Sequence, residues 1–197
     1  MTVVWLSQRY IWRCPASTVR SLYERNVGER HLDIGPGTGY YVSRAPVPEN
    51  GVVHLLDLNE VPLRRAAGRV KKRETRIHIA DALGEFPLED ASLDSVGCSM
   101  VMHCIPGDMA TKSAMFDEVA RVLRPGGRFF GATILSDGVD NSRAARKVLD
   151  VYNNSFDNAF HNTKDSFADL QRELENRFTD VDVRCCGSAG VWEVSAK

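Results

Sequence analysis

Three glycines at alternate positions follow an acidic residue in the segment HLDIGPGTGYY, residues 31–41. Gly35, Gly37 and Gly39 lack a β-carbon, so the backbone can take positive φ angles there and can lie directly against a ligand. The G-x-G-x-G spacing differs from the G-x-G-x-x-G spacing of a dinucleotide-binding loop, and Asp33 stands two residues before the first glycine. A carboxylate beside the loop would repel a phosphate and attract a cation. The loop therefore predicts a positively charged ligand.

Two further acids end the apolar segments GVVHLLD and RIHIAD. Asp57 follows the glycines at a distance of about 20 residues, where a carboxylate can accept hydrogen bonds from both hydroxyls of a ribose. Asp81 can accept a hydrogen bond from the exocyclic amine of an adenine ring, which Ala82 and Leu83 would flank. Three acceptors without a phosphate clamp indicate an adenosine that carries a positive charge and no phosphates.

These acids need a scaffold that brings the ends of several strands together. Apolar segments that alternate with helical patterns are typical of a parallel sheet covered on both sides. The last two strands are joined by a short turn of small residues, so they must pair antiparallel. The predicted strands span 30–34, 51–58, 76–81, 93–103, 128–135, 180–187 and 190–196, and the predicted helices span 3–13, 16–25, a segment from Tyr40, 61–73, 108–123, about 141–161 and 165–178.

The predicted fold class is α/β. It is a doubly wound, Rossmann-like, mostly parallel seven-stranded sheet with an antiparallel C-terminal edge hairpin and helices on both faces. A chain of 197 residues that is 43% hydrophobic suits one buried core better than two. We therefore predict a single domain over 1–197, with an N-terminal helical cap (1–27), a cofactor-binding core (28–135), and a lid helix with the C-terminal sheet edge (136–197).

Four segments in order, HLDIGPGTG, VVHLLDLN, IADALGEFPLEDASLDSVGCSMVMHCIP and EVARVLRPGGRFF, carry a family resemblance. The chain resembles class I S-adenosylmethionine-dependent methyltransferases of the small-molecule, methyltransferase type 11-like kind, over about residues 28 to 135. The resemblance implies S-adenosyl-L-methionine as cofactor and S-adenosyl-L-homocysteine as product. It implies methyl transfer to an oxygen, nitrogen, sulfur or carbon of a small-molecule acceptor, in metabolite or natural-product biosynthesis. The cofactor-binding residues, taken together, are Asp33, Gly35, Pro36, Gly37, Thr38, Gly39, Asp57, Leu58, Asp81, Ala82, Leu83, Ser99 and Met100.

His103 is the histidine nearest to the expected methyl group, at the end of the fourth predicted strand. Its ordinary pKa would suit a general base that deprotonates a hydroxyl or an amine, and a structural or substrate-shaping role is the alternative. In the family that the chain resembles, the N-terminal helix and the insert after strand five roof the substrate cleft. Both are short here, which favours a small organic acceptor. The predicted substrate-lining residues are Tyr10, Tyr40, Tyr41, His103, Tyr152 and Phe156.

The overall composition argues against several classes of partner. Lys and Arg number 25 against 26 Asp and Glu, so the formal net charge of -1 draws the chain neither to nucleic acid nor to an anionic membrane. The basic run RRAAGRVKKRETR lacks interleaved aromatic residues and is interpreted as a solvated face. Five cysteines without a C-x-x-C pair are typical of reduced thiols in a cytoplasmic protein and predict no metal site. We expect a monomer or homodimer with neither nucleic-acid nor membrane partners.

Three alternatives stay open from the sequence. A non-catalytic S-adenosylmethionine-binding module would keep the pocket without turnover. A nicotinamide-dependent oxidoreductase could share the topology, although the glycine spacing and Asp33 argue against it. A methyltransferase that acts on protein or RNA is encouraged only by the basic run.

Overall fold

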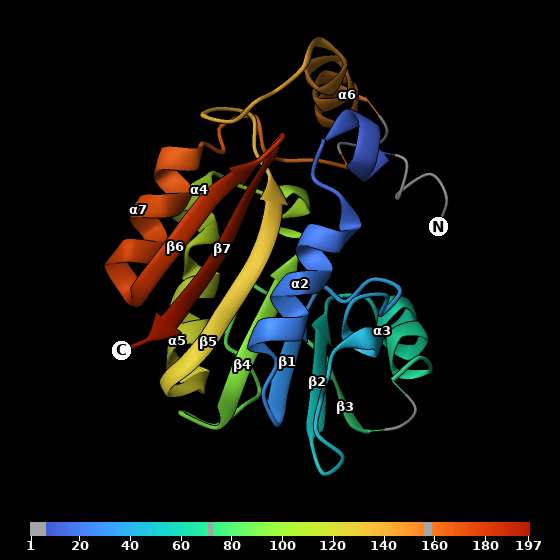
Figure 1. Cartoon of the computed structure of the whole chain (residues 1–197), viewed down its shortest axis with the longest axis vertical. Helices are drawn as coiled ribbons and strands as arrows, with labels where there is room; N and C mark the ends of the chain where they lie inside the picture. The colour runs from blue at the N-terminus through green and yellow to red at the C-terminus, as the bar shows by residue number, and fades with distance from the viewer. Residues whose placement is uncertain (1–6, 71–72, 156–158) are drawn as a thin grey trace.

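A computed structural model describes residues 7–70, 73–155 and 159–197 of the chain (Figure 1). It contains a seven-stranded sheet in the order β3-β2-β1-β4-β5-β7-β6. Strands β1 to β5 run parallel, whereas β7 is antiparallel to both β5 and β6. The predicted Rossmann-like sheet with an antiparallel C-terminal hairpin is confirmed. The strands are β1 (Arg30–Ile34), β2 (Val52–Asp57), β3 (Glu74–Ile79), β4 (Leu93–Ser99), β5 (Leu123–Ile134), β6 (Phe178–Cys186) and β7 (Ala189–Ala196).

The strand order reverses between β1 and β4. The chain runs outward from β1 through β2 to β3 and then returns to place β4 on the other side of β1. The crevice at the carboxyl ends of these two strands is the place where an open α/β sheet binds its ligand. The glycine loop follows β1 directly and therefore lies at this crevice.

Helices cover both faces of the sheet, as predicted. On one face lie α2 (Ala16–Asn26) and α3 (Glu60–Ala67), and α6 (Arg143–Asn154) lies beyond the carboxyl ends of the strands (Figure 1). The other face is covered by α5 (Ala114–Val122) and α7 (Phe167–Arg177), with the short helix α4 (Met109–Lys112) beside them.

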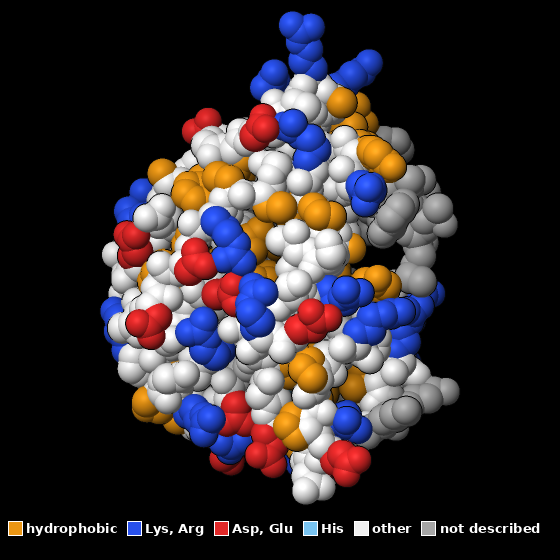
Figure 2. Space-filling model, in the orientation of Figure 1, with side chains coloured by type: hydrophobic (Ala, Val, Ile, Leu, Met, Phe, Trp, Pro, Cys, Tyr) orange, Lys and Arg blue, Asp and Glu red, His pale blue; other side chains and the backbone are white. Residues whose placement is uncertain are grey.

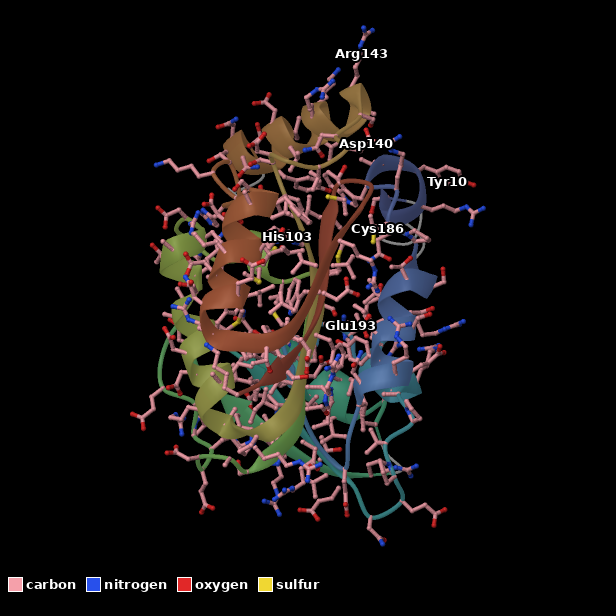
Figure 3. All side chains as sticks on the ribbon, turned by 60° about the vertical axis from the view of Figure 1, so that its left-hand side comes forward. Tyr10, His103, Asp140, Arg143, Cys186 and Glu193 are labelled. Carbon is pink, nitrogen blue, oxygen red and sulfur yellow. The ribbon has the colours of Figure 1, made fainter. Side chains whose placement is uncertain are left out.

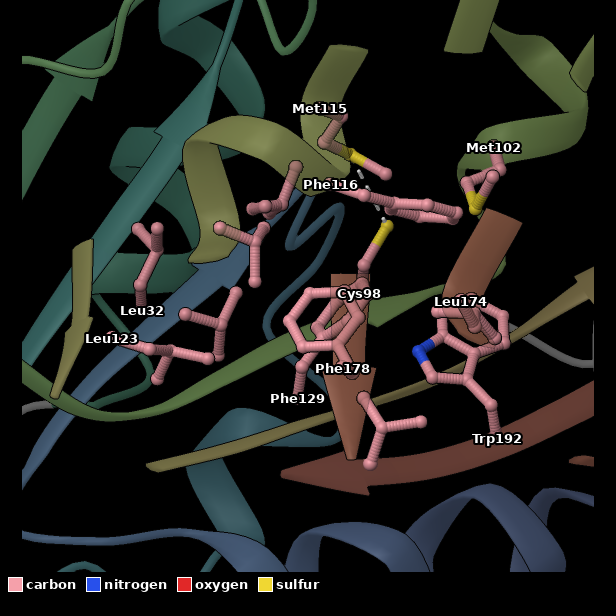
Figure 4. Close-up of a cluster of buried hydrophobic side chains, with 14 of the residues drawn as sticks. Leu32, Cys98, Met102, Met115, Phe116, Leu123, Phe129, Leu174, Phe178 and Trp192 are labelled. Atoms are coloured by element: carbon pink, nitrogen blue, oxygen red, sulfur yellow. Dashed lines mark hydrogen bonds between the residues drawn. The ribbon is translucent and has the colours of Figure 1, made fainter. Parts of the chain in front are cut away.

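A core of apolar side chains fills the space on each face of the sheet. Phe116, Phe129 and Trp192 are fully buried in the core under α5 and α7 (Figure 4). Phe130, the neighbour of Phe129 in β5, is equally buried but joins the core under α2 with Tyr23. Successive residues of a strand point to opposite faces, so β5 supplies both cores. Each such side chain contributes about 1.5–3 kcal/mol by leaving water.

Several predicted helices are wrong in extent. The helix expected from Tyr40 is only a 3-10 helix, Val42–Arg44, because Pro46 and Pro48 cannot donate helical hydrogen bonds and disfavour helical geometry before them. The lid helix expected over 141–161 ends at Asn154.

Two further helical segments also differ from the prediction. The helix expected over 108–123 is divided at Ser113 into α4 and α5. Within the cap helix expected over 3–13, residues 1–6 lie outside the described ranges, and Ser7–Ile11 form one turn of π-helix.

The surface shows no large field of one sign on the face seen in Figure 2, where acidic and basic side chains are interspersed. Basic side chains gather at the tip over α6, where Arg143, Arg146 and Lys147 are exposed. Among the helices in the described ranges, none has the length and apolar character that a membrane crossing requires.

His31 is a buried polar residue of β1 with a consequence for stability. Its side chain is fully buried, its Nδ1 lies 2.9 Å from Ser95 Oγ, and its ring is stacked on Phe130. Burial lowers the pKa of His31 to about 3, so the folded protein keeps this ring neutral. The unfolded chain takes up a proton near its ordinary value of about 6.5. Stability from this group is therefore lost as the pH falls below about 6.5.

We expect His31→Asn to weaken the acid sensitivity of the fold. The wild-type free energy of unfolding should fall between pH 7 and pH 5, with about 2 kcal/mol of that fall coming from His31. Asparagine keeps a polar atom near Ser95 but does not titrate, so this part of the fall should disappear. Urea denaturation at both pH values measures it. An equal loss in variant and wild type would contradict the assignment.

Candidate active site

The three glycines of the loop play two structural roles. All have positive φ, at 61° for Gly35, 52° for Gly37 and 71° for Gly39. A β-carbon on Gly35 would lie 2.4 Å from Val101 Cγ2, and one on Gly39 would lie 2.8 Å from the Cα of Ala66. At Gly37 the same β-carbon would meet nothing within 4 Å. The outer glycines therefore permit close packing, and the middle one leaves bare backbone beside open space.

Asp33 lies behind this loop as a buried carboxyl group. It is 2% exposed, and its Oδ1 accepts a hydrogen bond of 2.7 Å from the hydroxyl of Tyr23 on α2. Burial raises the pKa of Asp33 to about 7, and the hydrogen bond from Tyr23 opposes that rise. Near neutral pH this carboxyl group is thus balanced between its two protonation states, and a nearby cation would favour the charged one.

Tyr23 was not among the residues that the sequence pointed to. It belongs to the buried face of α2, together with Val19, Leu22 and Asn26. The helical spacing of these residues predicts burial, but the partner of the hydroxyl depends on how α2 is seated on the sheet. Burial followed by the charge of Asp33 raises the pKa of Tyr23, so the hydroxyl remains a donor to that carboxyl group.

Asp57 and Asp81 end β2 and follow β3 at the same edge as the glycine loop. One oxygen of each is used locally, because Asp57 Oδ1 accepts from the backbone N–H of Asn59 and Asp81 Oδ1 accepts from that of Leu83, both at 2.9 Å. These contacts fix both carboxylates in turns. No partner for either Oδ2 is found within the described residues. Leu58, next to Asp57, is 63% exposed and presents an apolar surface there.

The end of β4 is backbone-strained. Ser99 is buried, and Met100 has a φ of 62°, a conformation that costs a non-glycine residue about 1 kcal/mol or more. The backbone N–H of Met100 donates to the carbonyl of Ala132 at 2.7 Å, which holds it in place. The chain then enters a 3-10 helix, Met102–Cys104, that carries His103. Such strain is common where a chain is shaped around a ligand.

His103 is buried, with 4% of its surface exposed. Its Nδ1 lies 3.4 Å from the backbone nitrogen of Ile134, which donates to it, and 3.3 Å from Thr133 Oγ1. Burial, followed by the charge of Lys112, lowers the pKa of His103 to about 3. The ring is therefore neutral at pH 7. Because Nδ1 accepts, the ring proton is assigned to Nε2.

A cluster of aromatic rings surrounds His103 and joins three segments. The Phe160 ring centroid lies 4.4 Å from that of His103, 4.8 Å from that of Tyr152 on α6, and 6.0 Å from that of Trp12 near the N-terminus. These contacts bring the lid and cap segments together over the end of β4. Tyr152, predicted to line the substrate site, stacks on Phe160 near His103, whereas Phe156 falls outside the described residues.

The other predicted substrate-lining tyrosines lie nearer the glycine loop. The Tyr41 hydroxyl donates to Oε1 of Gln8 at 3.1 Å, which ties the cap to the loop. The Arg44 guanidinium lies over the Tyr40 ring at 4.2 Å, and a pocket of about 220 Å³ opens beside this ring. Tyr10 is 65% exposed and points away from the molecule (Figure 3). The structure therefore separates Tyr10 from His103.

A buried ion pair supports the lid side of the cluster. Lys112 and Asp165 are both fully buried, and Lys112 Nζ donates to Asp165 Oδ2 at 2.6 Å and to the carbonyl of His161 at 2.9 Å. Asn162, also fully buried, donates to the carbonyl of Ile134. These bonds hold residues 159–166 against the end of β5. Breaking one partner of such a pair leaves an uncompensated charge, so the segment is firmly placed.

Comparison with known proteins identifies relatives of this chain. The family described as "Methyltransferase domain" matches residues 32–131. Demethylluteothin O-methyltransferase of Streptomyces thioluteus is 36% identical over 92% of this chain and 78% of its own. N-methyltransferase vrtF of Penicillium aethiopicum is 33% identical over 93% of this chain and 77% of its own.

A solved structure shares the fold. N-methyltransferase NodS from Bradyrhizobium japonicum WM9, in complex with S-adenosyl-L-homocysteine, matches with a TM-score of 0.65 at 16% identity, over 90% of this chain and 85% of its own. The family match runs from the residue before Asp33 to the middle of β5. It therefore contains the glycine loop, the acids after β2 and β3, and the strained end of β4.

Proposed function

The chain belongs to the methyltransferase domain family, and from this premise we propose that it transfers a methyl group from S-adenosylmethionine to a small-molecule acceptor. The observation that carries the proposal is the bare backbone at Gly37, in the loop that follows β1 at the point where the strand order reverses. Apart from its chain neighbours, no atom of the described residues lies within 4 Å of the position that a β-carbon on Gly37 would take, so a ligand can approach the backbone there.

The residues at this edge fit such a cofactor. Asp33 would balance its ammonium group, Asp57 would accept from the ribose hydroxyls with the oxygen that the Asn59 turn leaves over, and Leu58 would cover the adenine ring. Asp81 would accept from the adenine amine. Arginine and lysine side chains are absent from this set, as suits a ligand without phosphates.

The cofactor supplies an electrophilic methyl group on a sulfonium ion. The contribution of the chain is to bind, to orient and to exclude water. Ser99 ends β4 and Met100 follows it, and the aromatic cluster of Phe160, Tyr152 and Trp12 packs on His103 just beyond them. Holding two reactants in line within a dry cleft accounts for a large part of the acceleration of such transfers.

We assign the acceptor to small, partly apolar molecules of secondary metabolism. Two relatives are named as methyltransferases of oxygen and nitrogen, which supports an acceptor with a hydroxyl or an amine. The rings around Phe160 offer an apolar wall, and α6 ends after 12 residues, which leaves a short lid. An apolar wall and a short lid suit a compact organic substrate.

Two measurements test the proposal in order. Calorimetry should show binding of S-adenosylhomocysteine in a one-to-one ratio. Incubation with methyl-labelled S-adenosylmethionine and a panel of phenols, carboxylic acids and amines should then give a labelled product. Binding without any product across the panel would favour a non-catalytic module. Absence of binding would overturn the proposal itself.

His103 has a testable role at the acceptor. We expect His103→Asn to lower kcat by less than about 10-fold, because a neutral ring whose Nδ1 already accepts from Ile134 is placed to position the acceptor through Nε2–H. Asparagine can still accept from the Ile134 N–H. We also expect the pH profiles of kcat for the wild type and for His103→Asn to have the same shape, with no limb that is present only in the wild type. A fall of about 1000-fold with loss of such a limb would restore His103 as the general base.

A further inference from the structure

Two cysteines far apart in sequence meet where the N-terminal segment crosses the β6–β7 turn. Cys14 is 1% exposed, and Cys186 is half-buried at the end of β6. The Cys186 Sγ lies 3.9 Å from the carbonyl oxygen of Arg13 and 3.9 Å from Thr18 Oγ1, so residues on both sides of Cys14 contact it. The Cys14 and Cys186 thiols lie close enough for each to shift the pKa of the other. Figure 3 shows Cys186 on the side of the hairpin that faces the N-terminal segment.

The backbone holds the two segments together at this crossing. The backbone N–H of Ser188 donates to the carbonyl of Trp12 at 2.8 Å. A β-carbon on Gly187 would lie 2.2 Å from the carbonyl oxygen of Trp12, so the backbones of the two segments are in direct contact. The Arg13 guanidinium also binds the Asp140 carboxylate at 2.7 Å, and the Asp140 N–H donates to the carbonyl of Gly187 at 3.1 Å, so Asp140 bridges the two segments. Cys14 and the end of β6 therefore stay side by side in the folded protein.

The two thiols differ in their chemistry. The neighbouring Cys14 thiol, followed by Thr18 and Arg184, lowers the pKa of Cys186 against the effect of burial. The neighbouring Cys186 thiol and burial raise the pKa of Cys14. Cys186 is therefore the more acidic thiol of the pair. The thiolate is the form that attacks oxidants. Cys185 is exposed, and desolvation raises its pKa.

We propose that Cys186 and Cys14 form a peroxide-sensitive site that closes into a disulfide bond between β6 and the N-terminal segment. The Cys186 thiolate attacks one oxygen of hydrogen peroxide, the O–O bond breaks, and a sulfenic acid and hydroxide form. The sulfur of Cys14 then attacks the sulfenic sulfur. The S–O bond breaks, and the hydroxyl group leaves as water with the Cys14 proton. Two electrons pass from the thiol pair to the peroxide.

The bond would fasten a segment that roofs the cleft. Cys14 is two residues from Trp12, whose ring contacts Phe160 over His103. Gln8, on the same segment, accepts from Tyr41 beside the glycine loop. If these contacts of Trp12 and Gln8 open when the cofactor and its product enter and leave, as the proposed function requires, oxidation would restrain that opening. We expect the oxidised protein to release S-adenosylhomocysteine at least about threefold more slowly, a modest change for a gate held at one end.

The experiment maps the bond in the full chain. Protein purified without oxygen is treated with one equivalent of hydrogen peroxide and digested with trypsin without reduction. The result expected is tryptic peptide 14–20 joined to peptide 185–197, reversed by dithiothreitol. Because Cys185 and Cys186 share a peptide, Cys185→Ser is the matched control, and it should keep the cross-link.

Two variants decide between Cys186 and other thiols. Cys14→Ser should stop at the sulfenic acid, which dimedone labels at residue 186, and Cys186→Ser should give neither label nor link. If Cys14→Ser fails to fold, Cys14→Ala replaces it. Thermal unfolding should shift upward on oxidation of wild type and Cys185→Ser, but not of Cys14→Ser. A link through Cys185, or dimedone preferring Cys104, would overturn the proposal. An unchanged release rate after complete oxidation would overturn the restraint on the cap.

Discussion

Gly37→Val is expected to weaken binding of S-adenosylhomocysteine by at least about 100-fold, because a branched side chain would fill the space that the bare backbone leaves open. The positive φ of 52° adds a strain of roughly 1–3 kcal/mol that the fold must also absorb. Binding and stability therefore need separate measurements. Calorimetry gives the dissociation constant, and urea denaturation gives the free energy of unfolding.

Gly126→Val provides the matched control for this change. Gly126 has a φ of 74°, and a β-carbon there also meets nothing within 4 Å. It lies near the beginning of β5, at the end of the parallel strands opposite to the end that carries the glycine loop. The control should therefore lose a similar amount of stability and keep its affinity within about twofold. Equal affinities of Gly37→Val and Gly126→Val for S-adenosylhomocysteine would contradict binding of the cofactor at the glycine loop.

Affinity for the cofactor is expected to rise as the pH increases from 6 to 8. The buried carboxyl group of Asp33 has a pKa raised to about 7, and only its charged form balances an ammonium group. Asp33→Asn should lower the affinity by about 100-fold and leave little dependence on pH in this range. Tyr23→Phe removes the hydrogen bond that opposes the rise, so the midpoint should move to higher pH. Calorimetric titrations with S-adenosylhomocysteine at four pH values measure the affinity of the wild type, Asp33→Asn and Tyr23→Phe.

Asp33→Asn should stabilise the ligand-free protein at pH 8. Between about pH 4 and pH 7 the folded state keeps a proton on Asp33 that the unfolded state has released, so stability falls as the pH rises through this window. Asparagine never bears that charge, so this cost, roughly 4 kcal/mol at about 1.4 kcal/mol per pKa unit, should vanish at pH 8. A thermal midpoint for Asp33→Asn below that of wild type at pH 8 would contradict the placement of a charged group there.

Structural features that depend on neighbouring residues in the sequence were easier to predict than features that depend on distant ones. The glycine loop and the acids after β2 and β3 were predicted at the correct strand ends, because strand and turn patterns are read within a few residues. The helix expected after Gly39 failed for an equally local reason that was overlooked, since Pro46 and Pro48 follow it closely.

Other features required distant parts of the chain. The hydrogen bond between Tyr23 and Asp33 depends on how a helix is seated on a strand, and the pairing of Lys112 with Asp165 joins residues 53 positions apart. The positive φ of Met100 accompanies a backbone hydrogen bond to Ala132 in β5. None of these leaves a periodic signal. The roles of the predicted site residues stay predictions for the experiments above.

The position of β7 has a bearing on how the sheet can assemble. β7 follows β6 in the chain, yet it lies between β5 and β6, and β6 pairs with β7 alone within the part that the structure describes. Without β7, β6 would have no partner in the sheet and its main-chain groups would be left unpaired. Closure of this flank of the sheet therefore depends on residues 189–196, which pair with a strand on each side.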